Sequence, residues 1–367
     1  MNARWEQWLL VQRTRKAQKK RVLYYVMVQS MAVGLRRQTE LGERKIIEII
    51  RQHLAPMPKM PVPFGDDVSA IEICNNDVAV LKTDMLVDKT DVPTGMSLRQ
   101  AGRKAVVMNV SDFAAKGVKP SIALVSLGLP RNLNQKDIAE LAEGLNAGAR
   151  EYDCYVVGGD TGEASDLVVS VSLFGLAKRD ELVLRSGARP GDIVAVTGPF
   201  GKTSAGLKIL LNSLQVPPSL RKVLVESVLT PYARLKEGLA LSRAHSVSAS
   251  IDSSDGLAWS LHELSRASRV GFLIDALPLA KEAERFARLY GLDAVELALY
   301  GGEEYELMLT VKPECWEKAQ QVIAEIGGVL LPIGKVTVKE GLILSTEGKR
   351  RMIEPKGYEH FKSDHVH

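Results

Sequence analysis

Acidic residues recur along this chain where an apolar, strand-like segment gives way to a loop. Asp66 and Asp67 precede one such segment, Asp84 follows the next, Asp160 follows Val157-Gly158-Gly159, and Asp252 and Asp255 follow Val247–Ile251. A single acid of this kind more often only closes a turn through a hydrogen bond to the backbone. The repetition favours a shared site instead, because strand ends in an α/β sheet meet at one edge and glycines there let a backbone approach a ligand.

The chemistry of such a site follows from its charge. Five or more converging carboxylates repel one another unless cations neutralise them. Ligands that are all oxygen favour a hard ion such as Mg²⁺ over zinc, and such ions usually handle phosphate groups. Paired glycosidase acids are the competing chemistry, but that reaction needs two carboxylates and sugar-stacking aromatics, which make up only 5% of the chain.

Hydrophobic periodicity predicts alternating strands and helices, and therefore an α/β (α+β) protein. Ser97 is the expected N-cap of a helix that carries Asp112, which taken alone would fit a solvated helix face. The predicted strands are Val68–Ile73, Val78–Leu81, Ile122–Leu129, Tyr155–Val157, Leu167–Leu176, Ile193–Thr197, Val247–Ile251, Phe272–Ile274 and Leu307–Val311, with a hairpin near Glu347-Gly348. The predicted helices are Glu40–Leu54, Ser97–Ala115, Gln135–Tyr152, Lys281–Tyr290 and Cys315–Ile326.

A glycine loop, Gly198–Thr203, follows the strand at Ile193 and contains Gly201-Lys202-Thr203. The spacing excludes a P-loop, because the required first glycine is replaced by Val196. The loop remains a strand-to-helix turn whose free amides could attract an anion. In the segment Asp252–Gly256, an acid or serine is expected to cap the helix that follows.

Composition narrows the class of protein. The 367 residues, 46% of them hydrophobic, suffice for two domains, and Arg185–Asp192 has the composition of a linker between them. Residues 1–37 hold nine Lys or Arg against one acid in a chain of net charge +4, so the body is net acidic and carries no nucleic-acid footprint. We interpret residues 1–37 as a basic extension; Tyr24 and Tyr25 in its short apolar core disfavour the alternative of a signal peptide.

The cysteines and hydropathy bear on the compartment. Cys74, Cys154 and Cys315 are odd in number and far apart, which fits neither a disulfide framework nor a metal site. No apolar run reaches the roughly 18 residues of a membrane span. We expect a cytoplasmic protein without a membrane partner.

Taken in order, the motifs resemble the thiamine-monophosphate kinase family, in its archaeal branch, within the superfamily of aminoimidazole ribonucleotide (AIR) synthetase (PurM-like). The resemblance spans about residues 40–361. It rests on Phe64–Asp67, Lys82–Val87, Arg103–Ala105, Met108–Gly117, Val157–Thr161, Arg185–Asp192, Ile251–Gly256, Tyr300–Glu306 and Gly357–Phe361.

The resemblance implies transfer of the γ-phosphoryl group of ATP to thiamine monophosphate, with several Mg²⁺ ions. Asp67, Asp84, Asp112, Asp160 and Asp252 would be catalytic through those ions. The implied metal ligands are Asp67, Thr83, Asp84, Asp112, Asp160, Asp252 and Asp255; Gly159, Asp160, Arg185 and Ser254 would bind the nucleotide, and Asp91, Glu303 and Tyr358 the acceptor.

Architecture and assembly are implied as well. A domain over residues 38–188 would bind ATP and Mg²⁺ and pair its sheet with a second subunit, an α/β domain would span residues 189–361, and a tail would follow over residues 362–367. Two positions depart from the bacterial pattern: Lys82 replaces a small hydroxyl residue, and Asp91 replaces a histidine. Lys82 could touch a phosphate, and Asp91 could pair with the thiazolium cation.

The sequence lacks the features expected of two other members of the superfamily. Selenophosphate synthetase would need a reactive cysteine near the first glycine loop, and HypE would end in a cysteine, whereas this chain ends in His367. The AIR synthetase reaction is harder to exclude on chemistry alone. A non-catalytic nucleotide-binding regulator is the alternative from another class.

Overall fold

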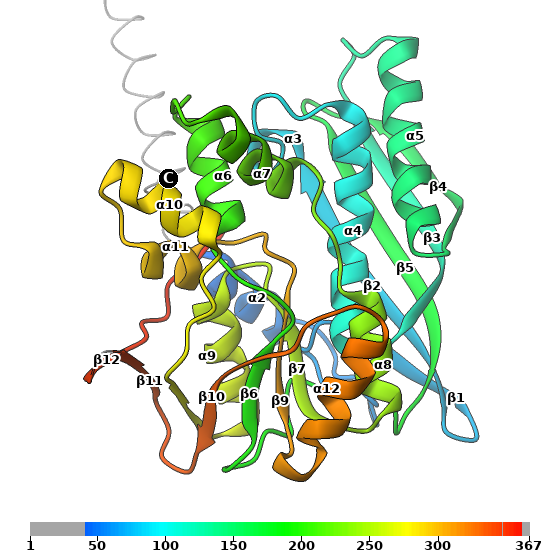
Figure 1. The fold of residues 1–367 in the computed structure, drawn as a ribbon. Helices are drawn as coiled ribbons and strands as arrows, with labels where there is room; N and C mark the ends of the chain where they lie inside the picture. The colour runs from blue at the N-terminus through cyan, green and yellow to red at the C-terminus, as the bar shows by residue number, and fades with distance from the viewer. Residues whose placement is uncertain (1–40, 347, 362–367) are drawn as a thin grey trace, which may run out of the picture. The chain divides into compact units, whose positions relative to one another are not determined.

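The computed structural model describes residues 41–346 and 348–361, so the basic extension and the tail lie outside the described residues. These residues form two compact units. The smaller contains helix α2 (Glu43–Gln52) and residues 359–361, joined by a hydrogen bond from the Glu43 amide to the His360 carbonyl (3.1 Å). The predicted first residue of that helix, Glu40, is not among the described ones. The larger unit, residues 57–358, holds both sheets (Figure 1).

The first sheet has the strand order β1-β2-β5-β3-β4. Only β3 and β4 run parallel; the other neighbours are antiparallel. The bounds are β1 Ser69–Cys74, β2 Asp77–Val87, β3 Lys119–Leu129, β4 Tyr155–Glu163 and β5 Val168–Lys178, with a short helix α3 (Asp88–Asp91) after β2. Helices α4 (Leu98–Lys116) and α5 (Gln135–Glu151) pack together beside it (Figure 1).

Helix α4 is the central element of this half. Ser97 accepts a hydrogen bond from the Gln100 amide and the Gln100 side chain caps it in return, which confirms the predicted N-cap. The helix ends at Gly117 in a left-handed conformation (φ 69°), where a Cβ would lie 2.2 Å from that of Ser242. Fourteen of its residues are buried, so α4 fixes polar side chains inside the molecule.

The second sheet has seven strands in the order β12-β11-β8-β10-β6-β9-β7, and β11–β8 is its one parallel pair among the described residues. The strands are β6 Ile193–Val196, β7 Val247–Asp252, β8 Gly271–Ile274, β9 Leu307–Val311, β10 Leu331–Thr337, β11 Leu342–Thr346 and β12 Lys349–Met352. The helices are α6 Lys202–Leu211, α7 Pro218–Leu229, α8 Leu235–Arg243, α9 Leu257–Ser268, α10 Lys281–Tyr290, α11 Ala294–Tyr300 and α12 Trp316–Glu325. No described helix is long and apolar enough to span a bilayer.

The two faces of the first sheet differ in burial. On the face toward α4, β2 places Val80, Lys82, Asp84 and Leu86 in alternation. The opposite face is largely exposed and carries large apolar side chains beside polar ones such as Thr83 and Asp160. Its large side chains are Ile71, Leu81, Met85, Ile122, Leu124, Tyr155 and Leu176, each 36–56% exposed.

Most predicted elements are present, but the predicted ends of two strands are wrong. Strand β4 is exposed rather than buried, and it runs through Gly158 and Gly159 to Glu163. Strand β2 likewise continues past Asp84 to Val87. Glycine does not end β4 because it serves close strand packing: a Cβ on Gly159 would lie 1.7 Å from the Val125 carbonyl oxygen.

Candidate active site

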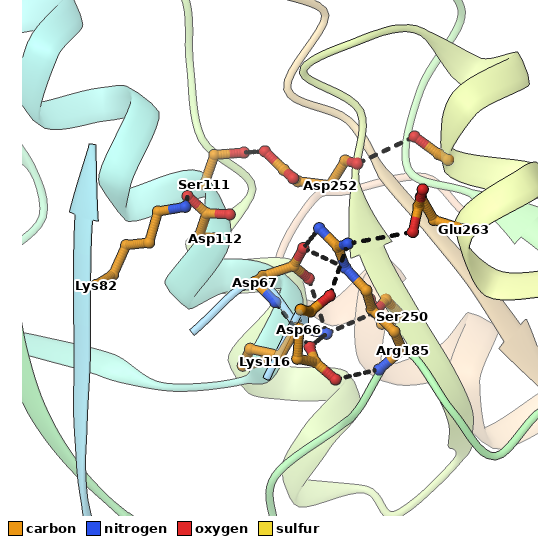
Figure 2. A network of polar contacts seen from close by, with 12 residues as sticks. Asp66, Asp67, Lys82, Ser111, Asp112, Lys116, Arg185, Ser250, Asp252 and Glu263 are labelled. Carbon is orange, nitrogen blue, oxygen red and sulfur yellow. Dashed lines mark hydrogen bonds and ion pairs between the residues drawn. The ribbon is translucent and has the colours of Figure 1, made fainter. Parts of the chain in front are cut away.

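Three acids from separate elements meet inside the larger unit. Asp67 comes from the loop before β1, Asp112 from α4 and Asp252 from the end of β7. They are only 3%, 6% and 4% exposed, and one oxygen from each lies within 4.8 Å of the others (Figure 2). The predicted convergence of acids is therefore found for this group, which we call the acid cluster.

Lys116, the last residue of α4, is the first cation that contacts the acid cluster. Its ammonium nitrogen lies 2.7 Å from Asp66 Oδ1 and 2.8 Å from Asp67 Oδ2, and it donates to the Ser250 carbonyl at 2.7 Å. Lys116 is fully buried. Two ion pairs and one hydrogen bond therefore hold this buried side chain in place.

Arg185 is the second cation of the acid cluster. Its Nε donates to Asp67 Oδ1 at 2.7 Å, its Nη2 pairs with the same carboxylate, and its Nη1 donates to the Gly65 carbonyl at 3.0 Å. Its backbone amide donates to Asp66 (2.9 Å), and Nη1 also lies 3.6 Å from Glu263 Oε2 (Figure 2). Arg185 thus orders the loop that carries both acids.

Lys82 is the third cation. It projects from the α4-facing side of β2, and its nitrogen lies 2.9 Å from Asp112 Oδ2 and 3.5 Å from Asp84 Oδ1. Its side chain is 18% exposed, and Asp84 beside it is 39% exposed. Asp84 therefore lies at the open rim of the acid cluster, linked to it through Lys82.

The charges shift the acidity of the acid cluster in different directions. Burial, followed by the nearby Asp67 charge, raises the pKa of Asp252 to about 7 even though Ser111 donates a hydrogen bond to it at 2.6 Å. Burial also raises the pKa of Asp112 well above its ordinary value, and Lys82 only partly offsets this. Burial opposes ionisation of Asp67 too, but Arg185 and Lys116 hold its pKa below its ordinary value. Without a bound cation, Asp112 and Asp252 are therefore the acids of the cluster whose ionised form is least favoured.

These residues suit a hard divalent cation. The donors are carboxylate oxygens from three elements that lie close enough together to share an ion. Burial, and after it the neighbouring acids, raises the pKa values of Asp112 and Asp252, and a divalent cation bound beside them would favour their ionised, ligating form. Lys82, Lys116 and Arg185 already balance part of the charge of the acids, so a metal ion would not be the only cation at this site.

Comparison with known proteins shows which family has this architecture. Family models match residues 65–177 (AIR synthase related protein, N-terminal domain) and 189–346 (AIR synthase related protein, C-terminal domain). A curated relative from Nitrosopumilus maritimus, named thiamine-monophosphate kinase, is 34% identical over 324 residues, which cover 88% of this chain and 100% of the relative. The chain belongs to the thiamine-monophosphate kinase family.

Two further relatives agree. A thiamine-monophosphate kinase from Pyrococcus horikoshii is 36% identical, with coverage of 86% of this chain and 96% of the relative. The solved structure "AaThiL complexed with AMPPCP and TMP" aligns with a TM-score of 0.76 at 32% identity, covering 87% of this chain and 97% of that one. The two-domain fold implied by the sequence resemblance is thereby confirmed.

Not every residue implied by the kinase-family resemblance joins the acid cluster. The Thr83 hydroxyl donates to the Val171 carbonyl (3.2 Å) and accepts from Ser172 (3.0 Å), on the sheet face opposite Asp84. Asp160 pairs in register with Ser126 on β3, which places it on that same outer face. Strand β4 is three strands from β2, or about 14 Å. Thr83 and Asp160 therefore lie apart from Asp67, Asp112 and Asp252.

Two residues expected at the acceptor are held by one lysine. Lys104 of α4 is 1% exposed, donates to the Asp91 carbonyl at 2.7 Å and forms an ion pair with Glu303. The Asp91 carboxylate accepts from the Val87 amide at 2.7 Å. Lys104 thus ties the end of helix α3 to the loop that carries Glu303.

The acidic segment Glu303–Glu306 is anchored at three points. Besides Glu303, Glu304 accepts from the amides of Gly201 (2.6 Å) and Thr203 (3.3 Å), and Glu306 pairs with Arg234 (2.5 Å). Burial raises the pKa of Glu304 to about 7. Two amides of the glycine loop, which were expected to attract an anion, therefore already bind the Glu304 side chain of the same protein.

The remaining expected residues cluster near the start of α9. The Asp255 carbonyl accepts from the Tyr358 amide at 3.1 Å, and the exposed Ser254 offers its carbonyl to the Glu303 amide at 2.6 Å. The expected cap is wrong: the N-cap of α9 is Gly256 (φ 107°), and no side chain caps it. The carbonyl groups of this segment are instead tied to the Glu303 and Tyr358 segments.

The roles of Lys104, Lys116 and Glu304 were missed by sequence reasoning. Lys104 and Lys116 were visible only as members of the motifs around α4, where a lysine commonly points to solvent. The available signal was their position: each recurs on a helix whose other residues are apolar or small.

Proposed function

We propose that this protein transfers the γ-phosphoryl group of ATP to thiamine monophosphate, giving thiamine diphosphate. The family membership and the acid cluster support this activity. The single observation that carries it is the relative solved with AMPPCP, an ATP analogue, and TMP, which aligns over 87% of this chain.

In the proposed reaction, an oxygen of the acceptor phosphate forms a bond to the γ-phosphorus while the bond to the β-phosphate oxygen breaks, and ADP leaves. The acceptor phosphate is largely ionised near pH 7, since its second pKa is about 6, so no dedicated general base is required. Bound Mg²⁺ would neutralise the phosphates. We assign Asp67, Asp112 and Asp252 to hold it, with Asp84 as a further ligand at the rim, and Lys116 and Arg185 keep the Asp67 carboxylate in place.

The other implied roles stay predictions. Arg185, Gly159 and Ser254 are assigned to the nucleotide, with Arg185 acting while it remains paired to Asp67. Asp91, Glu303 and Tyr358 are assigned to the acceptor, and Asp255 to a further ion.

A homodimer is part of the proposal. The outer face of the first sheet exposes seven large apolar side chains from all five strands, and apolar patches of this kind mark protein interfaces. A second copy seated there would bring its residues near Thr83 and Asp160, which share this face. We propose that these two residues act at the subunit boundary, beside the ATP.

The domain division proposed here is 38–188 and 189–361, with the linker at Arg185–Asp192. A cytoplasmic location fits the cysteines, which are free in the structure: Cys74 is exposed, Cys154 buried and Cys315 intermediate. Neither assignment affects the proposed chemistry.

The test is to incubate the purified protein with ATP, Mg²⁺ and thiamine monophosphate and to look for thiamine diphosphate. Asp252→Asn should lower kcat by about 100-fold or more. Asp192→Asn is the matched control, because Asp192 is equally buried (4% exposed) but accepts from the Arg189 amide outside the acid cluster. No product, with ATP still bound in calorimetry, would favour the nucleotide-binding regulator; an ATP-dependent cyclisation activity would favour the AIR synthetase reading.

A further inference from the structure

We propose that the ammonium group of Lys82 is a built-in cation of the phosphoryl-transfer site, which takes the place of one divalent ion between Asp84 and Asp112. The inference rests on the proposed function, because that function gives the acid cluster its ligands. The nitrogen of Lys82 lies 2.9 Å from Asp112 and 3.5 Å from Asp84, which come from different elements, α4 and β2. It is thus placed as a shared ion would be.

The other two cations, Lys116 and Arg185, bind other acceptors than Asp84 and Asp112. Lys116 is fully buried, forms ion pairs with Asp66 and Asp67, and donates a hydrogen bond to the Ser250 carbonyl. Arg185 pairs with Asp67 and also contacts Gly65 and Glu263. Both therefore hold the loop of Asp66 and Asp67, and neither lies between Asp84 and Asp112.

Lys82 has fewer polar partners than Lys116 or Arg185 among the described residues. Its side chain is 18% exposed, and its carboxylate partners within the described part of the chain number two against three available donors. One donor can therefore face a phosphate oxygen without loss of the acid partners.

A divalent ion cannot share this position with an ammonium group, because the like charges would repel at contact distance. With Lys82 present, the acid cluster still offers a divalent ion one oxygen each from Asp67, Asp112 and Asp252, which lie within 4.8 Å of one another. Without Lys82, Asp84 and Asp112 would be free to bind one more ion.

The experiment counts metal ions rather than turnover. Mn²⁺ is titrated into the native protein and into Lys82→Met, each saturated with AMPPCP, and free Mn²⁺ is followed by electron paramagnetic resonance. We expect one additional Mn²⁺ per chain in Lys82→Met, and the native count in Lys82→Arg. Lys178→Met is the matched control and should leave the count unchanged, because Lys178 pairs with Asp77 (2.5 Å) on the same sheet away from the site.

An equal count in Lys82→Met and the native protein would overturn the inference and leave Lys82 as a structural bridge only. If Lys82→Met does not fold, Lys82→Gln is counted in its place. As a second readout, MgCl2 should raise the Tm of the neutral variant more than that of the native protein, because an extra site binds only the folded state. The count requires no phosphoryl transfer, so a native protein that makes no thiamine diphosphate refutes the proposed function without deciding the count.

Discussion

Replacing Lys116 by methionine tests how the acid cluster is held together. Methionine keeps most of the volume of the side chain but removes the charge that lies 2.7 Å from Asp66 and 2.8 Å from Asp67. Both carboxylates are nearly inaccessible, with side-chain exposures of 2% and 0%. Their negative charges would then be buried with one cationic partner fewer.

The expected cost follows from that burial. Removing one partner of a buried ion pair typically lowers the free energy of unfolding by about 3–5 kcal/mol. Arg185 still pairs with Asp67 in the variant, which favours the lower end, about 3 kcal/mol. With a urea m-value of about 3 kcal/mol/M, the midpoint should fall by about 1 M.

The assay is urea unfolding followed by circular dichroism, with Lys119→Met as the control. Lys119 pairs with Asp153 at 2.5 Å, but the two side chains are 52% and 63% exposed, so its removal should cost under about 1 kcal/mol. Equal losses in the two variants, or a loss below about 1 kcal/mol in Lys116→Met, would show that this buried lysine does not support the acid cluster.

Three further expectations follow. Gly159→Ala should destabilise the protein by about 1–3 kcal/mol in thermal unfolding because its Cβ would overlap a backbone oxygen of β3, whereas Gly162→Ala, which has open space, should be near neutral; similar values would refute this packing. The folded pKa of Glu304, about 7, exceeds its ordinary 4.5, so its contribution to stability is complete below pH 4.5 and is lost as the pH rises through 7. Glu304→Gln should therefore gain on the order of 3 kcal/mol relative to the native protein over that range, and a pH-independent difference in urea unfolding would contradict it. Lys104→Met should release Glu303 and raise the KM for thiamine monophosphate, not that for ATP; steady-state kinetics in which both KM values stay unchanged would argue against this.

The sequence was most informative where local pattern and burial agree. The helix Lys281–Tyr290 and the strand Leu307–Val311 have the predicted bounds, because each joins a regular apolar pattern to clear ends. The convergence of Asp67, Asp112 and Asp252 was also predictable, since acids inside apolar segments need partners.

What could not be predicted depends on long-range geometry. Which face of a sheet carries Asp160 depends on register with β3, and a shift of one residue would reverse it. The missed helices, α7, α8 and α11, have short or irregular apolar patterns and are stabilised by packing. The pairing of Lys104 with Glu303 joins residues 199 positions apart in sequence, which no local pattern reveals.

Lys116 and two other residues of α4 form buried polar contacts with the second matched domain, which limits how the chain could be cut into separate domains. Lys116 donates to the Ser250 carbonyl on β7, Ser111 to Asp252, and Lys104 pairs with Glu303, so buried polar groups of each matched domain are completed by the other. If the gene were cut between the two domains, each fragment would expose charges and donors that only its counterpart can satisfy. We therefore expect the two domains to fold stably only together, so that recombination would have to exchange them as a pair.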